Sequence, residues 1–445
     1  MVSVAHLEKG MYVSELDRPW LDSPFIFQGF RITNHDEIRQ LQAVCEYVFV
    51  DQERSSTQVP KHAIFQLVAT RPKPAANTKP PVAALTGVVA NATSQVVSNK
   101  GKFNNQEPRL TQPLEYQAGF EEELPLAQET FQEAIQYIGE FFQQVRTGAS
   151  LDSQQVTEHV GALTQSVIRQ PDALLLLSSL KRKGDYALQH AMNVCILSLV
   201  FGRQLGLDEA QLNELGIGAL LHDIGETLIP DDILLKSGVY TAAENKIRHS
   251  HTTQGAALLE QFPGIPKSAI NIANHHHERT DGSGYPNALR GAEIDLFTRI
   301  VTITDIYDMA TSGLYNNPVV TASSALKKIY ELRQRFFDAT LVEKFIQCLG
   351  IYPIGSVVEF TSSEIGIVIS AEPRKRLTPK VLLVRDRFER VMTPPKVLNV
   401  AFFHERGIKD RYKIKRVVKA ENYGIDVQNF IIHDLPQSLA TASAA

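Results

Sequence analysis

Cysteine is scarce in this chain of 445 residues. Its three cysteines, Cys45, Cys195 and Cys348, lie far apart, and none belongs to a CxxC pair. This spacing excludes a disulfide framework and a thiolate zinc site, and it is typical of a protein from a reducing cytoplasm. Any metal chemistry is therefore expected to use imidazole and carboxylate ligands.

Long apolar runs are also missing. The N-terminus, MVSVAHLEKGMYV, carries charged residues and has no apolar core of signal-peptide length. The most apolar stretches, 173–180 and 194–201, are far shorter than the roughly 20 residues that span a bilayer. We therefore expect a cytoplasmic protein with no membrane partner.

The chain has no excess of positive charge. Its 45 Lys and Arg residues are outnumbered by 49 Asp and Glu residues, which gives a formal net charge of -4. The chain as a whole therefore offers no electrostatic attraction to DNA, RNA or an anionic membrane. A small polyanion stays a candidate ligand, provided that a local site holds it.

The pattern of apolar residues changes along the chain. Hydrophobic residues make up 43% of it, which is enough for more than one core. We predict a small α+β module over 1–70, a flexible proline-rich linker over 71–117, a helical domain over 118–350, a β-rich module over 351–433 and a frayed tail over 434–445. The predicted fold class is mainly α, with a helical bundle between two small modules. In the β-rich module, Pro394 and Pro395 are expected to separate strands.

Histidine, in contrast, is concentrated in one region. Seven of the 13 histidines fall between residues 190 and 277. Capping signals predict three successive helices with His190, His222 and His251 on them or at their ends. These signals are Asp185, Asp208 with Gln211, and Thr241 with Glu244, and the last of them predicts one helix through Glu260. Separations of about 30 residues allow each ligand to come from a different helix of one bundle.

A metal centre must be weighed against simpler explanations of these histidines. A lone histidine on a helix is more often a surface or hydrogen-bonded residue than a metal ligand. The pairs His222–Asp223 and His276–His277 are harder to explain in that way, and a run of ionisable residues and a glycine-rich turn follow the second pair. Imidazole and carboxylate together suit divalent metals, and shared aspartates allow two ions.

Two motifs identify a family. Residues 222–225, HDIG, resemble the HD signature of metal-dependent phosphohydrolases, and residues 276–286, HHERTDGSGYP, match the HHExxDGxGYP signature of HD-GYP domains. The similarity extends over about 120–350, and residues 1–70 resemble the uncharacterised module that often precedes HD-GYP domains in bacteria. The resemblance implies hydrolysis of a cyclic dinucleotide, chiefly cyclic di-GMP, to the linear dinucleotide or to GMP.

The resemblance also implies the metal ligands. They are His190, His222, Asp223, His251, His276, His277 and Asp305. It makes Asp223 the bridge between two ions and gives catalytic roles to Asp223 and His222. Some relatives hold a third metal with a glutamate four residues before the first histidine. That position is Tyr186 here, so we predict two divalent ions, iron, manganese or similar.

The predicted substrate contacts are Tyr285, Asp308 and Glu226. Relatives usually carry a lysine in place of Glu226, near the substrate phosphate, so the carboxylate reverses the sign of a close interaction. Relatives also have Arg-Pro-Tyr-Arg or a similar basic pair where this chain has residues 313–318, including Leu314. These losses predict altered specificity, with 3′,3′-cyclic GMP-AMP as an alternative to cyclic di-GMP.

Two histidines of the region are set aside. His249 lies two residues before His251, about 200° around a helix, so we expect it to face solvent. His275 precedes the matching pair and is predicted to lie behind the ligands or at the surface.

Two other functions are left open by the sequence. Glu226 and Leu314 also fit a catalytically weak receptor, which binds a cyclic dinucleotide and signals through the flanking modules. The Gly-Tyr-Pro loop is alternatively a docking site for a partner of the diguanylate-cyclase type. A homodimer is a further alternative.

Overall fold

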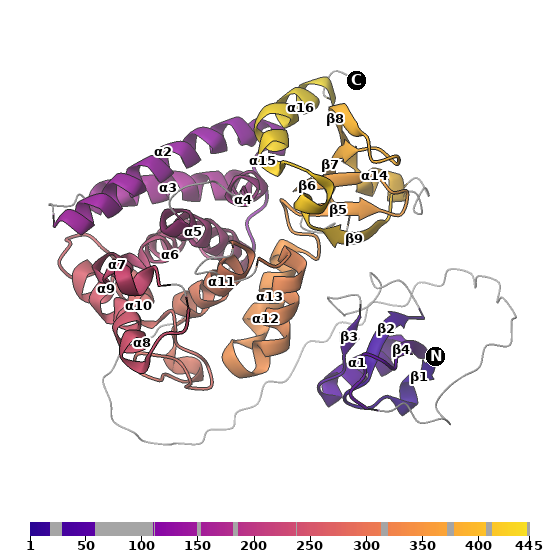
Figure 1. The fold of residues 1–445 in the computed structure, drawn as a ribbon, viewed down its shortest axis with the longest axis horizontal. Helices are drawn as coiled ribbons and strands as arrows, with labels where there is room; N and C mark the ends of the chain where they lie inside the picture. The colour runs from indigo at the N-terminus through magenta and orange to yellow at the C-terminus, as the bar shows by residue number, and fades with distance from the viewer. Residues whose placement is uncertain are drawn as a thin grey trace, which may run out of the picture. The chain divides into compact units, whose positions relative to one another are not determined.

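The chain forms two compact units, 1–106 and 107–445 (Figure 1). The structure is a computed structural model, and it describes residues 1–17, 29–57, 110, 112–148, 153–180, 186–236, 238–312, 319–371, 378–405 and 412–442. Most of the predicted linker, the capping residue Asp185 and the segment around Leu314 lie outside the described residues.

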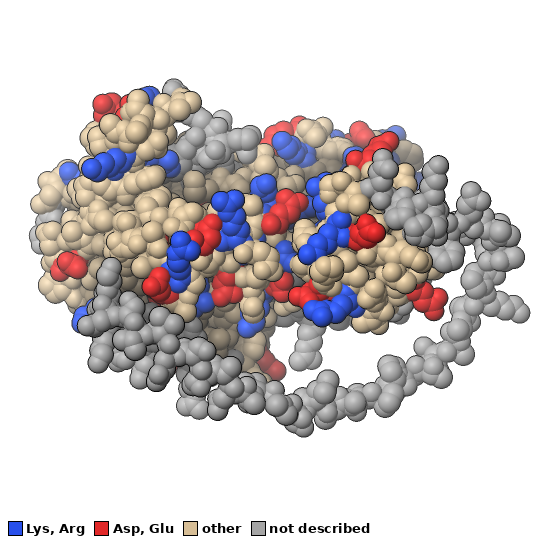
Figure 2. Space-filling model, turned by 90° about the horizontal axis from the view of Figure 1, so that it is seen from below, with Lys and Arg blue, Asp and Glu red and all other residues tan. Residues whose placement is uncertain are grey.

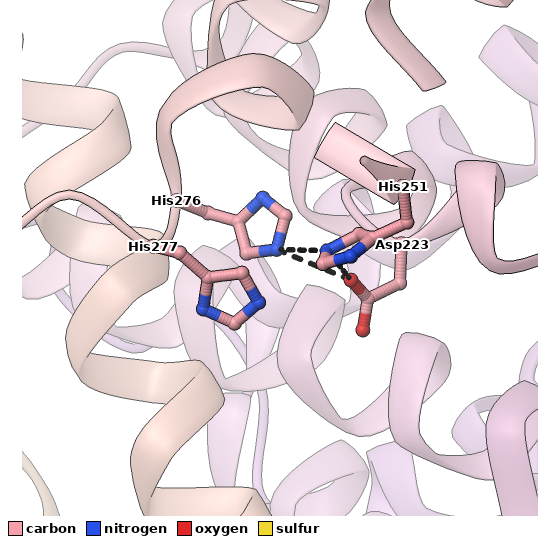
Figure 3. A group of neighbouring side chains, drawn as sticks. All are labelled: Asp223, His251, His276 and His277. Atoms are coloured by element: carbon pink, nitrogen blue, oxygen red, sulfur yellow. Dashed lines mark hydrogen bonds and ion pairs between the residues drawn. The ribbon is translucent and has the colours of Figure 1, made fainter. Parts of the chain in front are cut away.

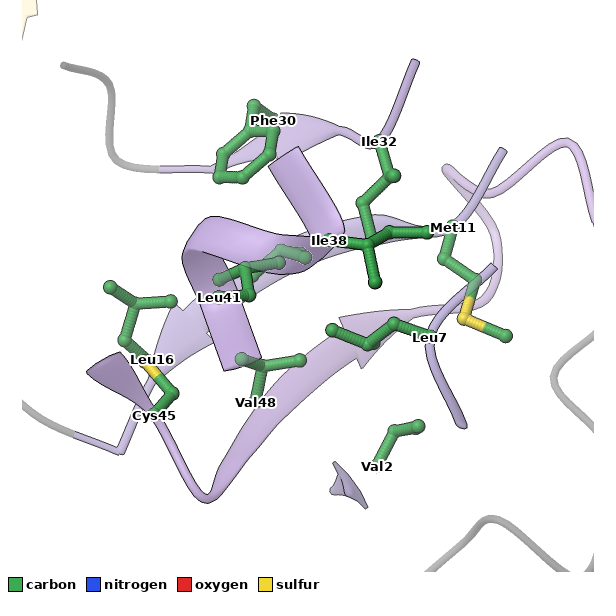
Figure 4. Close-up of a cluster of buried hydrophobic side chains, with 11 residues drawn as sticks. Val2, Leu7, Met11, Leu16, Phe30, Ile32, Ile38, Leu41, Cys45 and Val48 are labelled. Atoms are coloured by element: carbon green, nitrogen blue, oxygen red, sulfur yellow. The ribbon is translucent and has the colours of Figure 1, made fainter. Parts of the chain in front are cut away.

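The N-terminal unit is an antiparallel sheet with one helix. Its strands are β1 (Val2–Ser3), β2 (Tyr12–Leu16), β3 (Phe30–Arg31) and β4 (Tyr47–Asp51), in the order β1-β4-β2-β3. Helix α1 (His35–Val44) begins at a capping box formed by Asn34 and Glu37. Ile38 and Leu41 point from α1 into the buried core shown in Figure 4. The predicted α+β character of this module is confirmed.

The second unit begins as a helical bundle. Its helices are α2 (Phe120–Thr147), α3 (Ser153–Arg169), α4 (Pro171–Ser178), α5 (Tyr186–Leu205), α6 (Glu209–Leu221), α7 (Asp231–Leu234), α8 (Ala242–His249), α9 (His251–Leu259), α10 (Lys267–His275), α11 (Leu296–Ser312), α12 (Ala322–Phe336) and α13 (Ala339–Leu349). Helix α5 is buried along most of its length because α4, α6, α11 and α13 pack around it. An apolar sequence on every face is typical of such a central helix.

Local signals begin the helices that lead to the predicted ligands. The two predicted capping boxes that fall within the described residues are both present, Asp208 with Gln211 at α6 and Thr241 with Glu244 at α8. The single helix predicted from Thr241 to Glu260 is wrong, because Ser250 (φ -68°, ψ -9°) separates α8 from α9. Residues before and after Ser250 therefore do not share one helical register.

A buried ion pair ties α2 to α3. The Glu123 side chain is fully buried, and both of its oxygens accept hydrogen bonds from Arg169, at 2.7 and 2.8 Å. Ser166 donates a third hydrogen bond to Glu123 at 2.7 Å. The Arg169 side chain is 35% exposed, so water partly screens its charge, but Arg169→Ala would still leave the buried Glu123 carboxylate without its counter-charge. We expect it to lower the free energy of unfolding of the helical domain by about 1.5–3 kcal/mol. Urea unfolding followed by circular dichroism measures this loss.

A surface ion pair provides the control for that measurement. Lys380 and Glu121 lie 2.9 Å apart, but their side chains are 31% and 39% exposed. Lys380→Ala is therefore expected to cost about 1 kcal/mol or less. Equal losses for Arg169→Ala and Lys380→Ala would contradict the assigned weight of the buried pair.

A five-stranded antiparallel sheet follows the bundle. Its strands are β5 (Val357–Phe360), β6 (Ile365–Ser370), β7 (Lys380–Arg385), β8 (Val391–Asn399) and β9 (Ile414–Val418), in the order β8-β7-β6-β5-β9. Asp172 of α4 joins it to the bundle, because it accepts hydrogen bonds from the Ser370 hydroxyl and the Ala371 amide. The mainly helical fold class with a β-rich C-terminal module is confirmed.

Two predictions about the C-terminal part are wrong. Pro394 and Pro395 were expected to separate strands, but both lie within β8, an edge strand that tolerates residues without an N–H. The expected tail from 434 contains helix α16 (Leu435–Ala442), which packs on β8. Leu435 and Leu439 are one helical turn apart and buried, so they anchor this helix despite its small, weakly apolar residues.

The near balance of acidic and basic residues and the shortness of the apolar runs are both visible in the structure. On the face shown in Figure 2, acidic and basic side chains are interspersed. Among the described residues, no helix is long and apolar enough to cross a membrane.

Candidate metal centre

Seven ionisable side chains converge inside the helical bundle. They form two groups, each with its ligand atoms within 4.8 Å of one another: Asp223, His251, His276 and His277 in the first, and His190, His222 and Asp305 in the second. Figure 3 shows the first group. The seven residues are those expected from the resemblance, and the structure brings all of them together.

Helix ends supply most of these side chains. His190 lies on α5 and Asp305 on α11, His222 and Asp223 follow α6, His251 begins α9, and His276 and His277 follow α10. At a helix end the chain direction changes, so two adjacent side chains can both reach one site. This explains how the pairs His222–Asp223 and His276–His277 contribute two ligands each.

Two glycines of the motifs allow the close approach of these segments. A Cβ atom on Gly225 would lie 2.0 Å from the carbonyl oxygen of His251, so the turn after the HD pair touches the start of α9. A Cβ atom on Gly284 would lie 2.5 Å from the carbonyl oxygen of His277. No other residue fits at either place without moving the backbone.

Asp223 lies between the two groups. Its Oδ2 is 3.2 Å from Nε2 of His222 and 3.7 Å from Nε2 of His190. Its Oδ1 is 3.2 Å from Nε2 of His251 and 3.1 Å from Nε2 of His276. One carboxylate oxygen thus faces each group, which is the geometry of a bridging ligand.

Hydrogen bonds behind the imidazoles set their tautomers. The Nδ1 partners are the Asp308 carboxylate for His190 (2.7 Å) and the carbonyls of Ala219 for His222 (2.8 Å), Arg248 for His251 (2.7 Å) and Ala273 for His276 (3.1 Å). A carbonyl or carboxylate can only accept, so each Nδ1 carries the proton and donates it. In the neutral rings, Nε2 therefore presents a lone pair to the centre of the cluster.

The centre is consequently a collection of facing acceptors. Five buried atoms there have no hydrogen-bond partner: Nε2 of His190, Nε2 of His222, Oδ1 of Asp223 and both carboxylate oxygens of Asp305. Unpaired buried acceptors are costly, and a cation between them removes the cost. The donor set of imidazole nitrogen and carboxylate oxygen fits divalent iron, manganese or zinc. The three cysteines are buried and lie outside both groups.

The pKa values of two residues of the cluster are shifted by their charged neighbours. Burial alone would lower the pKa of His190, but the adjacent carboxylates of Asp305 and Asp308 raise it well above its usual value. Burial would raise the pKa of Asp223, but the neighbouring His222 and the other imidazoles lower it well below its usual range. Protons and metal ions compete for these lone pairs, so metal binding releases protons.

Asp308 does not have the position predicted for a substrate contact. It is 4% exposed, and one of its oxygens accepts from Nδ1 of His190 while the other accepts from the Asn193 amide at 2.9 Å. Both oxygens are therefore used behind the cluster. This is the position that carboxylates behind metal-bound histidines commonly take.

The other two predicted substrate contacts lie at the cluster. The Tyr285 ring centroid is 4.8 Å from that of His277. Glu226 is buried, and its charge contributes to the raised pKa of His251, after burial and the effect of Asp223. Tyr186 is 61% exposed at the start of α5, so it adds no ligand to the two groups.

The structure also places the two histidines that the sequence set aside. His249 is only partly exposed, because its ring stacks on Tyr285 with centroids 3.8 Å apart, so the prediction that it faces away from the site is wrong. The turn at Ser250 breaks the helical register from which its direction was predicted. His275 is buried and bonds to Asn271 and Asn287, which fixes the end of α10 against the following loop.

Two residues inside the long motif were not singled out from the sequence. Glu278 accepts hydrogen bonds from the backbone amides of Asn287 and Leu289, so it holds the Gly-Tyr-Pro loop. Arg279 donates to the carbonyls of His276 and Glu278. The sequence offered one signal for the role of these two residues, which is their position between His276–His277 and the Gly-Tyr-Pro turn.

The fold and the site define a helical domain of the HD class. Residues 174–341 match the family model described as HD domain, a metal-dependent phosphohydrolase fold. Residues 1–156 match the model described as Domain of unknown function (DUF3391). The chain therefore contains an HD domain preceded by the uncharacterised module that the sequence resemblance indicated.

Curated relatives resemble the chain over different lengths. The cyclic di-GMP phosphodiesterase PA4108 of Pseudomonas aeruginosa is 28% identical over 401 residues, which cover 90% of this chain and 88% of that protein. A cyclic di-GMP phosphodiesterase of Thermotoga maritima is 37% identical over 36% of this chain and 44% of its own length. The 3′3′-cGAMP-specific phosphodiesterase 1 of Vibrio cholerae is 34% identical over 32% of each chain. The chain thus spans most of the first relative and less than half of the other two.

Proposed function

We propose that this chain is a metal-dependent phosphodiesterase that hydrolyses a cyclic dinucleotide in the cytoplasm. Two divalent ions, iron or manganese, are assigned to the two ligand groups, with Asp223 between them. The observation that supports this most directly is the set of facing acceptors, because cations bound between the five buried atoms without partners would remove the cost of leaving them unpaired. The names of the relatives support the substrate class.

Separate residues of this chain hold the ligands in place and face the substrate. When bound, the two ions lower the pKa of a water molecule and neutralise charge on the phosphodiester. Backbone carbonyls and Asp308 hold the imidazoles with Nε2 facing inward. Burial raises the pKa of the Tyr285 phenol, so this group stays neutral and can donate a hydrogen bond. Gly284 keeps the Tyr285 loop against His277.

The proposal is tested with the full chain loaded anaerobically with Fe(II) or Mn(II). Separate incubation with cyclic di-GMP and with 3′,3′-cyclic GMP-AMP, followed by chromatography, is expected to show the linear dinucleotide or mononucleotides from at least one of them. Turnover of neither substrate with either metal would overturn the proposal.

Glu226 distinguishes an active enzyme from a weak receptor. A carboxylate beside His251 repels an incoming phosphate, whereas a lysine would attract it. Charged hydrogen bonds contribute about 1.5–3 kcal/mol, so we expect Glu226→Lys to lower the KM for cyclic di-GMP by about tenfold or more. Steady-state kinetics with both cyclic dinucleotides measures the change.

Glu226→Gln is the matched control, because it removes the charge without adding the opposite one. It is expected to give a KM between those of the wild type and of Glu226→Lys. An unchanged KM in both variants would show that residue 226 does not contact the phosphate. Binding without turnover by the wild type, with turnover restored by Glu226→Lys, would instead identify a receptor. A cyclase partner and a homodimer stay predictions.

A further inference from the structure

His249 and Tyr285 form a stacked pair at the edge of the metal centre. Their ring planes are 7° apart and their centroids are separated by 3.8 Å. His249 is the last residue of α8, whereas Tyr285 belongs to the Gly-Tyr-Pro loop, so the stack joins two separate segments. Neither the motifs nor the ligand set accounts for this imidazole.

Tyr285 connects this stack to the cluster. Its ring lies 4.8 Å from the ring of His277 and 6.4 Å from the ring of His251. The loop backbone is fixed at Gly284, where there is no room for a Cβ atom. The rings in contact with Tyr285, those of His249 and His277, therefore help to set the direction of its side chain.

The stack also limits how Tyr285 can meet a ligand. The His249 ring covers one face of the tyrosine in near-parallel contact. A purine base of the substrate cannot use that face, so the hydroxyl edge of the ring is the part best placed to act.

We propose that His249 is a positioning residue, which holds the Tyr285 hydroxyl toward the phosphodiester of the bound cyclic dinucleotide. This inference rests on the proposed function, since it names the residue that prepares Tyr285 for the substrate. Aromatic stacking fixes a ring by an amount equivalent to about three- to tenfold in population. A tyrosine that is already ordered loses less freedom when the substrate binds.

The closing experiment compares His249→Ala with His249→Phe in the Mn(II)-loaded full chain. His249→Ala is expected to lower kcat/KM by about three- to tenfold, and His249→Phe, which retains a stacking ring, is expected to restore it to within about twofold of the wild type. Metal content is expected to be the same in all three proteins. In a Tyr285→Ala background, His249→Ala is expected to have no further effect.

The chain offers a matched control. His159 of α3 stacks on Tyr137 of α2 with centroids 4.6 Å apart, and neither helix carries a residue of the cluster. His159→Ala removes the same kind of stack and is expected to leave kcat/KM unchanged. Equal losses in His249→Ala and His159→Ala, or no rescue by phenylalanine, would overturn the inference.

A second readout does not depend on turnover. Nitration of Tyr285 by tetranitromethane, performed at alkaline pH because the reagent attacks the phenolate and located by mass spectrometry, reports how often the ring is uncovered and ionised. It is expected to be about threefold faster in His249→Ala than in the wild type and in His249→Phe. Unchanged nitration would show that His249 does not cover Tyr285. If nitration responds but the wild type hydrolyses no cyclic dinucleotide, the proposed function fails and the stack itself is upheld.

Discussion

Asp223→Asn is expected to abolish turnover of the cyclic dinucleotide and to reduce metal content from about two ions per chain to one or fewer. The carboxylate faces both ligand groups with different oxygens, at 3.1–3.2 Å from three imidazoles. An amide has only one oxygen and no charge, so it cannot serve both groups. Because Lewis-acid stabilisation contributes several kcal/mol, kcat/KM is expected to fall by about 10³-fold or more.

The measurement combines metal analysis of anaerobically purified protein with chromatographic assays. Asp208→Asn is a suitable control, because Asp208 caps the helix that leads to Asp223 and asparagine caps equally well. This control is expected to keep its metal and its activity. An Asp223→Asn variant that retained two ions and most of its activity would exclude Asp223 as the bridge.

Much of the site was predictable because its residues are adjacent to each other in short motifs. His222–Asp223 and His276–His277 each lie at a helix end, where both side chains turn toward one cluster, and Gly225 and Gly284 allow the segments to touch. Such local constraints can be seen in the sequence. The convergence of these segments with His190 and Asp305 came from the family resemblance, since spacing alone fixes no distances.

The predictions that failed depended on tertiary contacts or on a local break in a helix. His249 was placed in solvent by counting degrees along one helix, but Ser250 interrupts that helix. Helix α16 was not predicted because its sequence is weakly apolar, and its packing on β8, with Leu435 and Leu439 buried, is a tertiary contact that the sequence does not show. The substrate role of Asp308 stays a prediction, since the motif shows the type of this residue but not the direction of its side chain, which lies against His190 and Asn193.

Asp308→Asn is also expected to lower kcat strongly. Its carboxylate accepts from Nδ1 of His190 at 2.7 Å and from Asn193 at 2.9 Å. The amide of Asp308→Asn has one acceptor oxygen, so it cannot accept from both His190 and Asn193. One of these two donors would then face the amide nitrogen, which is also a donor. Loss of such an orienting carboxylate typically costs 10- to 100-fold in metal affinity or activity, and we expect that range for kcat. We also expect the group of His190, His222 and Asp305 to lose its ion first.

The two roles considered for Asp308 have different kinetic signatures. If it orients His190, Asp308→Asn lowers metal content toward one ion per chain, and added Mn(II) partly restores kcat with little change in KM. If it contacts substrate, KM rises while two ions stay bound. Asn193→Ala, which removes the other donor to Asp308, is expected to act in the same direction with a smaller effect. Asp426→Asn, at a helix cap in the C-terminal module, serves as the carboxylate-to-amide control. Full metal content with a raised KM in Asp308→Asn would return Asp308 to the substrate site, and an unchanged kcat would remove it from both roles.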